Sequence, residues 1–284
     1  MIELHDVVKR YGTRNAVDHA TLAVPEGTSL ALWGSNGAGK TTLIRCILGV
    51  TGFKGDVRID GISSRRKGKE ARKRIGYVPQ SMPTFDISVA EMVQLVARLR
   101  QADPRPGLAR LDAFGLGHTL TQPVASLSGG MKQKLALTLA LLGDPPILLL
   151  DEPTANLDAR SQSDLIATLV ELKHHGRTIV FTSHRWSEVR ALADHVVRLE
   201  SGKMVGHGTV QEMEPKLDTV TLRLPLPVDA LDTAVEHLAR HGFTAGRNGH
   251  AVLVTVDGTR KAEPLMLLAQ QDYTISDFIV EEEA

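Results

Sequence analysis

The chain has 284 residues, of which 42% are hydrophobic and 23% are charged, so it has the composition of a globular protein with room for one large and one small domain. Lysine and arginine total 33, and aspartate and glutamate also total 33. Because these charges balance, no overall field favours nucleic acid or an anionic membrane, and we expect no nucleic-acid partner. The lone cysteine, Cys46, excludes an internal disulfide and a thiolate metal site, and we expect it at a buried helix position.

The sequence contains no segment that is typical of a membrane span. Its first residues, Met1 to His5, lack the basic region and long apolar stretch of a secretory signal. The most apolar region, residues 135–150, is interrupted by Gly143-Asp144-Pro145-Pro146. The remaining pieces are shorter than the roughly 20 apolar residues that span a bilayer, so we expect that the chain does not cross a membrane by itself.

Strands and helices alternate along the first three quarters of the chain. Apolar and β-branched patterns predict strands at residues 2–8, about 16–24, 28–33, 56–60, 147–150 and 178–182. Helical periodicity, caps and glycine stops predict helices at about 39–48, from Ser88 onward, and at about 158–175. This alternation predicts an α/β fold with a parallel sheet. The mostly helical stretch, about 86–143, is interpreted as a subdomain inserted into that sheet.

Residues 65–74 contain seven basic side chains and one acidic side chain. A solvated helix face is the preferred interpretation of this run. A patch for lipid or for a partner protein is the alternative.

Beyond about residue 215 the pattern changes. It predicts a strand, a helix, two strands, a helix and a strand, at residues 219–224, 228–240, 243–247, 251–256, 260–270 and 273–280. This β-α-β-β-α-β order is the split βαβ arrangement of ferredoxin-like α+β domains. We therefore divide the chain into residues 1–214 and 215–284, and expect the second domain to regulate the first or to stabilise a dimer. Its His237 and His241 share a helix face and could chelate copper or zinc, but a solvated face is preferred because no third ligand is evident.

A phosphate-binding loop follows the third predicted strand. Residues 34–41 read Gly-Ser-Asn-Gly-Ala-Gly-Lys-Thr and lie between a predicted strand and a predicted helix, as that motif requires. The glycines let successive backbone N–H groups point at phosphates, and the helix N-terminus adds partial positive charge. Lys40 supplies a full charge to the β- and γ-phosphates, and Thr41 offers a hydroxyl to Mg²⁺. The residues expected to bind ATP here are Gly34, Ser35, Asn36, Gly37, Ala38, Gly39, Lys40, Thr41 and Thr42.

Two carboxylates follow the apolar strand at residues 147–150. A buried strand thus delivers acid groups at its C-terminal edge, where ligands bind in open α/β sheets. Asp151 is expected to hold Mg²⁺, directly or through water. Glu152 is placed to act as the general base that polarises the attacking water. Simple capping of the next helix is the alternative, and the phosphate-binding loop disfavours it.

Residues 127–133 read Leu-Ser-Gly-Gly-Met-Lys-Gln, directly before a strongly apolar helix. Bare N–H groups at this helix start, with the Ser128 hydroxyl, can bind a second anion. Here the chain resembles the signature motif of the ATP-binding cassette (ABC) family. The resemblance implies that Ser128, Gly129 and Gly130 grip the γ-phosphate of an ATP held by the opposite subunit. It therefore implies a head-to-tail homodimer.

Four further residues match positions of that family, and the resemblance spans about residues 1–212. It implies that Tyr11 stacks on adenine and that Gln80 reaches Mg²⁺ and the attacking water. It also implies that Asp158 communicates across the dimer and that His184 contacts the γ-phosphate. The resemblance also implies the family's fold, which is a phosphate-loop NTPase core with an inserted helical subdomain.

The resemblance implies an ATP-hydrolysing, Mg²⁺-dependent subunit of an exporter-type ABC transporter at the cytoplasmic face of the membrane. The cargo is chosen by a separate transmembrane permease, which we expect to contact the chain near Gln80, Met82 and Phe85. Alternatives are the copper-linked maturation transporter of nitrous oxide reductase and a soluble cassette ATPase acting on ribosomes or DNA. A single phosphate loop without sustained heptads disfavours the soluble class. The presence of Glu152 and His184 disfavours a non-hydrolysing regulatory cassette.

Overall fold

The computed structural model describes residues 1–83, 85–155, 157–214, 220–256, 260–271, 273 and 278–281. The chain divides into two compact units, Met1–Met213 and Glu214–Ala284, one residue before the expected boundary. Within the described ranges, no helix is both long and apolar enough to cross a bilayer.

A six-stranded sheet forms the centre of the first unit. Its order is β10-β9-β3-β8-β7-β6, and all neighbours are parallel except the edge pair β10 and β9. The strands span β3 Ser29–Trp33, β6 Ile75–Val78, β7 Ile147–Leu150, β8 Thr178–Ser183, β9 His195–Glu200 and β10 Lys203–Thr209. Strands β3, β7 and β8 are buried almost throughout, as their nearly continuous apolar sequences predict.

A second, antiparallel sheet has the order β2-β1-β4-β5. Its strands are β1 Ile2–Tyr11, β2 Arg14–Val24, β4 Lys54–Ile59 and β5 Ile62–Ser63. One hydrophobic core joins both sheets to the buried face of helix α1 (Lys40–Ile47). Cys46 lies in this core, as expected, and burial raises the pKa of its thiol to about 11.

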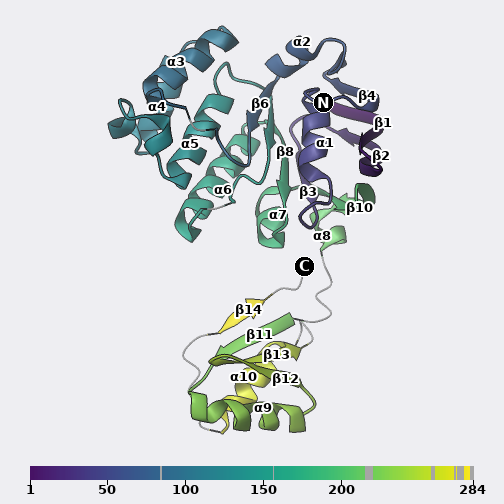
Figure 1. Cartoon of the computed structure of the whole chain (residues 1–284), viewed down its shortest axis with the longest axis vertical. Coiled ribbons are helices and arrows are strands. Elements are labelled where there is room, and N and C mark those ends of the chain that lie inside the picture. Colours follow the sequence, from purple (N-terminus) through teal and green to yellow (C-terminus); the bar gives the residue numbers. More distant parts are fainter. Residues whose placement is uncertain are drawn as a thin grey trace. The chain divides into compact units, whose positions relative to one another are not determined.

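The expected helical insertion comprises α3 (Val89–Arg100), α4 (Arg105–Ala113) and α5 (Gly129–Ala140), which gather on one side of the central sheet (Figure 1). Ser88 begins α3 with the expected capping box. Its Oγ accepts from the Glu91 N–H at 3.2 Å, and the Glu91 carboxylate accepts from the Ser88 N–H at 2.8 Å. The insertion has its own apolar core and also lies against β6, where a Cβ on Gly76 would lie 2.4 Å from the Ala140 carbonyl oxygen. A glycine at position 76 therefore permits the close approach of α5.

The remaining helices of the first unit complete its layers. They are α2 (Gly68–Lys73), α6 (Ala159–His174), α7 (Trp186–Leu192) and α8 (Val210–Met213). The short helix α2 falls within the basic run, and its lysines and arginine are exposed, which both a solvated face and a binding patch require.

The second unit is a four-stranded antiparallel sheet with two helices. Its elements are β11 Val220–Pro225, α9 Leu231–Arg240, β12 Thr244–Asn248, β13 Ala251–Val256, α10 Ala262–Ala269 and β14 Ile279–Glu281. The sheet order is β12-β13-β11-β14, so β13 lies between the two strands of the first βαβ unit, as in a split βαβ arrangement. Half of the strand expected at 273–280, residues 274–277, lies outside the described residues. Buried side chains from β11, β13, α9 and α10 give this unit a separate core.

Candidate active site

The phosphate-binding loop connects the end of β3 to the start of α1. Gly39 has a φ of +107°, and a Cβ there would lie 2.2 Å from the Ala16 carbonyl oxygen, so only glycine fits against β2. The loop curls around the lysine that follows it. Lys40 is 5% exposed, and its Nζ donates to the Gly34 carbonyl at 2.7 Å and to the Ser35 carbonyl at 3.1 Å. These two hydrogen bonds hold the lysine side chain inside the curve of the loop.

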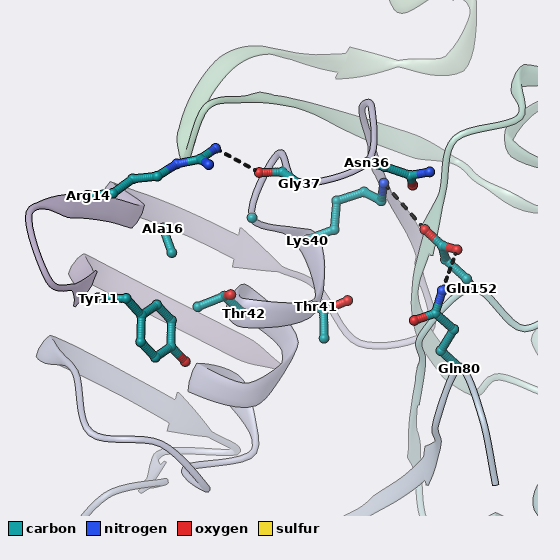
Figure 2. A pocket seen from close by; sticks show the side chains of 11 residues that line it. Tyr11, Arg14, Ala16, Asn36, Gly37, Lys40, Thr41, Thr42, Gln80 and Glu152 are labelled. Atoms are coloured by element: carbon teal, nitrogen blue, oxygen red, sulfur yellow. Dashed lines mark hydrogen bonds and ion pairs between the residues drawn. The ribbon is translucent and has the colours of Figure 1, made fainter.

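A pocket of about 480 Å³ opens beside this loop, a size typical of small-molecule sites. Figure 2 shows Tyr11 and Ala16 at one end of the pocket and Gln80 and Glu152 at the other, with Lys40 between them. The lining comprises Tyr11, Arg14, Ala16, Asn36, Gly37, Gly39, Lys40, Thr41, Thr42, Gln80 and Glu152. An aromatic ring at one end and charged groups at the other suit a ligand with a planar base and a phosphate chain.

Asp151 directly follows strand β7 and is 2% exposed. Its Oδ1 accepts from the Thr41 hydroxyl at 3.0 Å and from the Thr182 hydroxyl at 2.8 Å. Burial raises the pKa of Asp151, the two hydroxyl donors oppose that rise, and the charge of Glu152 adds to it. The site thus holds a desolvated carboxylate beside the first residues of α1.

Glu152 is the point at which the polar side chains converge. Its Oε1 lies 3.5 Å from the Lys40 Nζ and 3.8 Å from the His184 Nδ1, and its Oε2 accepts from the Gln80 amide at 2.9 Å. Its backbone has a positive φ of 45°, and its N–H donates to the Thr182 hydroxyl at 2.7 Å. The structure therefore brings Lys40, Gln80 and His184 around the carboxylate that the sequence predicts to be the base.

The Leu-Ser-Gly-Gly segment lies at the start of α5. Ser128 caps this helix, because its Oγ accepts from the Met131 N–H at 3.3 Å, and the Ser128 and Gly129 positions are exposed. Gly130 faces the start of α6, where a Cβ on it would lie 3.3 Å from the Ser161 Oγ. An exposed helix start of this kind can receive an anion from outside the chain.

Asp158 caps the neighbouring helix α6. Its carboxylate accepts from the Ser161 N–H at 2.9 Å and from the Ser161 hydroxyl at 2.9 Å, and the backbone hydrogen bond from Ser161 lowers its pKa. Neither Asp158 nor Ser128, Gly129 or Gly130 is among the described residues that line the pocket. The predicted site residues therefore fall into two separate groups within one chain.

Sequence reasoning missed three residues of the site, and one of them is Ala16, which lines the pocket. Arg14 lines the pocket, and its Nη2 donates to the Gly37 carbonyl at 3.1 Å (Figure 2). Thr182 lies on strand β8, and its hydroxyl donates to the Asp151 carboxylate and accepts from the Glu152 N–H. None of these positions carries a motif, because their contacts depend on how separate segments of the chain meet. Three predicted ATP-binding residues, Gly34, Ser35 and Ala38, belong to the loop but not to the lining.

The two apolar residues expected to meet a permease differ in their surroundings. Met82 is partly buried and packs against the core of the central sheet and that of the helical insertion. Phe85 is 42% exposed. Met82 therefore packs onto the helical subdomain, and Phe85 is the more exposed of the two side chains. Thr84, between them, lies outside the described residues.

Among the described residues, the histidine pair of the second unit has no third metal ligand beside it. The rings of His237 and His241 have centroids 4.6 Å apart, and the His241 Nδ1 lies 2.9 Å from the His237 carbonyl oxygen. Across the described part of the chain, no group of three or more histidine, cysteine or acidic side chains is placed to hold a metal ion.

Comparison with known proteins agrees with this geometry. The family model described as "ABC transporter" matches residues 17–155. The chain is 35% identical over 236 residues to the ATP-binding cassette sub-family A member 7 of Rattus norvegicus, covering 79% of this chain but only 11% of that protein. It is 37% identical over 203 residues to the zinc import ATP-binding protein ZnuC of Pseudomonas fluorescens (strain Pf0-1), covering 70% of this chain and 73% of that one.

A solved structure has the same fold over the first unit. It is a dimeric ATP-binding cassette in a post-hydrolysis state, bound to ADP and Pi, with a TM-score of 0.68 and 25% identity. The match covers 74% of this chain and 99% of that one. The expected phosphate-loop NTPase fold is thereby confirmed.

Proposed function

Because this chain belongs to the ABC transporter family, as one of its ATP-binding cassettes, we propose that it hydrolyses ATP to power transport by a separate membrane subunit. The observation that carries this proposal is the convergence of Lys40, Gln80 and His184 on Glu152 at one end of a pocket whose other end holds Tyr11. The chain spans about a tenth of the first relative described above, so the activity of that whole protein is not carried over. Cassettes of this family are ATPases.

The pocket supports a definite placement of ATP. The adenine lies against Tyr11 and Ala16, and the phosphates follow the loop toward Lys40. Lys40 then turns from the Gly34 and Ser35 carbonyls to the phosphate oxygens. This releases Glu152 from its ion pair with Lys40 and leaves the carboxylate free to act as a base.

Hydrolysis then requires one proton transfer and one bond exchange. Glu152 takes a proton from water as the water oxygen attacks the γ-phosphorus, and the bond from that phosphorus to the β–γ bridging oxygen breaks. ADP and phosphate are the products. Gln80 and His184, which flank the carboxylate, orient the water and the γ-phosphate.

The residues present also fit Mg²⁺. The Thr41 hydroxyl and the Asp151 carboxylate already touch at 3.0 Å, and Gln80 can offer its amide oxygen from the other side of Glu152. These are hard oxygen donors, which Mg²⁺ prefers. When bound there, the ion neutralises charge on the β- and γ-phosphates.

The position of the signature residues supports a head-to-tail homodimer. Ser128, Gly129 and Gly130 lie outside the pocket of their own chain, yet they form an exposed anion-binding helix start. A second copy can bring this helix start, together with Asp158, to the γ-phosphate. The dimeric cassette to which the first unit is similar supports this arrangement.

The membrane partner and the direction of transport are inferred from the family. We assign the chain to the cytoplasmic face of the membrane, attached to a permease that selects the cargo and meets the surface near Gln80 and Phe85. Export is the proposed direction. A copper-linked maturation transporter and a soluble cassette ATPase remain the alternative functions.

Replacing the base tests the enzymatic part of the proposal. Glu152→Gln retains a similar shape but cannot accept the proton, so ATP turnover is expected to fall by about two or more orders of magnitude. ATP binding is expected to remain, and the variant is expected to elute as an ATP-dependent dimer from a sizing column. Turnover close to that of the wild type would exclude Glu152 as the base.

A further inference from the structure

A second pocket lies on the first unit and shares no lining residue with the pocket beside the phosphate loop. It has a volume of about 370 Å³ and is formed by helix α2, the end of helix α3 and the residues after α5. We call it the basic groove, and its lining comprises Lys69, Arg72, Lys73, Leu99, Arg100, Leu142 and Gly143. Three of its four cations come from the basic run at residues 65–74, whose role the ATPase site leaves unexplained.

The positive charge of the basic groove is not neutralised within the described part of the chain. There, no carboxylate forms an ion pair with any of the four cations that line it, and Glu70 of α2 pairs instead with Lys67 at 3.8 Å. Arg100 is half-buried and donates to the Leu142 carbonyl at 3.4 Å and to the Ile75 carbonyl at 3.0 Å. These neutral acceptors fix its guanidinium in place and leave its charge to act on the groove.

An apolar rim borders these cations. Leu99 is 75% exposed, and Leu95, one helical turn earlier on α3, is 41% exposed. Exposed leucines beside lysines and arginines are the combination that helices present to the headgroup region of a membrane. Clusters of four to eight basic residues of this kind bind anionic lipids.

We propose that the basic groove binds the phosphate-bearing headgroup of an anionic phospholipid. Lys69, Lys73 and Arg100 surround the phosphate, and Leu99 lies against the adjoining acyl region. A single-stranded nucleic acid is the other polyanion to consider, but the groove has the volume of a small-molecule site and no aromatic side chain in its lining on which a base could stack. This contact would hold the cassette against the bilayer independently of a permease.

Co-sedimentation of the full chain with vesicles tests the proposal. The protein is expected to bind vesicles of phosphatidylcholine mixed with phosphatidylglycerol, to bind them less at higher salt, and not to bind pure phosphatidylcholine. Lys69 and Lys73 are exposed, so the double variant Lys69→Ala/Lys73→Ala should fold and keep wild-type ATPase activity. Its partition onto anionic vesicles should fall about thirty-fold, the effect of two lysines near the surface.

The matched control is Lys54→Ala/Lys203→Ala, which removes the same charge from exposed positions on β4 and β10 outside the groove. It is expected to bind anionic vesicles almost as the wild type does. Equal losses in the two double variants, or equal binding to neutral and anionic vesicles, would overturn the proposal. So would a Lys69- and Lys73-dependent affinity for an oligonucleotide or for glycerophosphate in the absence of vesicle binding.

Discussion

The adjacent carboxylates of Asp151 and Glu152 have different surroundings, which suit them to the different roles proposed for them. Asp151 is buried and accepts from two hydroxyls, whereas Glu152 faces a lysine, an amide and a histidine at the edge of the pocket. The first environment suits a fixed metal ligand and the second suits a group that must gain and lose a proton. The residue order Asp-Glu alone does not distinguish the two roles, because the distinction depends on the neighbours that folding supplies.

Asp151→Asn tests the environment of the buried carboxylate. Because the pKa of Asp151 is raised in the folded protein, nucleotide-free protein loses stability as the pH rises through that raised value. Asparagine keeps an oxygen that accepts from Thr41 and Thr182 but removes the charge. Thermal unfolding without nucleotide at pH 7 should show a higher midpoint for the variant than for the wild type, and the extra stabilisation by Mg²⁺ over ATP alone should be lost. Asp151→Ala, which leaves both hydroxyls without their acceptor, should not share the gain, and a lower midpoint for Asp151→Asn would contradict this account.

At the scale of single residues, the sequence identifies the parts of the site that lie close together along the chain. The phosphate loop and the Asp-Glu pair are contiguous motifs with a required strand before them, so both are found where expected. Arg14 and Thr182 act on backbone groups of other segments and carry no local signal. Met82 and Phe85 are both apolar, so the sequence does not distinguish their roles. Their packing in the folded structure does.

Among secondary-structure elements, a nearly continuous apolar sequence decides which strands can be predicted. Such sequences form β3, β7 and β8, and the pattern predicts each of these strands within about one residue. Strand β6 contains a glycine, and β10 is an edge strand with exposed positions and two glycines. Neither has the pattern of a buried or an alternating strand, so their places depend on the sheet that pairs with them.

The segment between β6 and α3 gives a prediction at this scale. Phe85→Ser should weaken co-purification with the permease while leaving basal ATPase activity and the unfolding midpoint unchanged, because the side chain is exposed. Met82→Ser should instead lower the free energy of unfolding by about 1 kcal/mol, since it removes contacts with two cores. Pull-down yields and thermal unfolding of both variants separate the two effects. A full yield of the complex with Phe85→Ser would move the permease contact elsewhere.

In the whole molecule, the two units have separate cores, and the proposed catalytic residues all lie in the first. A chain ending after Met213 should therefore fold and bind ATP as tightly as the full chain. We expect its dimerisation or its response to the permease to change, because a small antiparallel sheet with an edge strand is suited to pairing. Circular dichroism, calorimetric titration with ATP and sedimentation velocity measure these properties. A truncated chain that is folded but does not bind ATP would refute the claim that the first unit binds ATP by itself.

The central claim is that each ATP site combines the phosphate loop of one chain with the signature helix of another. Two inactive variants test it directly: Lys40→Ala, which damages the phosphate loop, and Ser128→Arg, which blocks the exposed start of α5. In a mixed dimer, one site combines the intact phosphate loop of the Ser128→Arg chain with the intact signature helix of the Lys40→Ala chain, and the other site carries both defects. Mixing the two inactive proteins at equal concentration is therefore expected to restore ATPase activity. If the mixture stays as inactive as its components although mixed dimers form, the two motifs do not act across a head-to-tail interface.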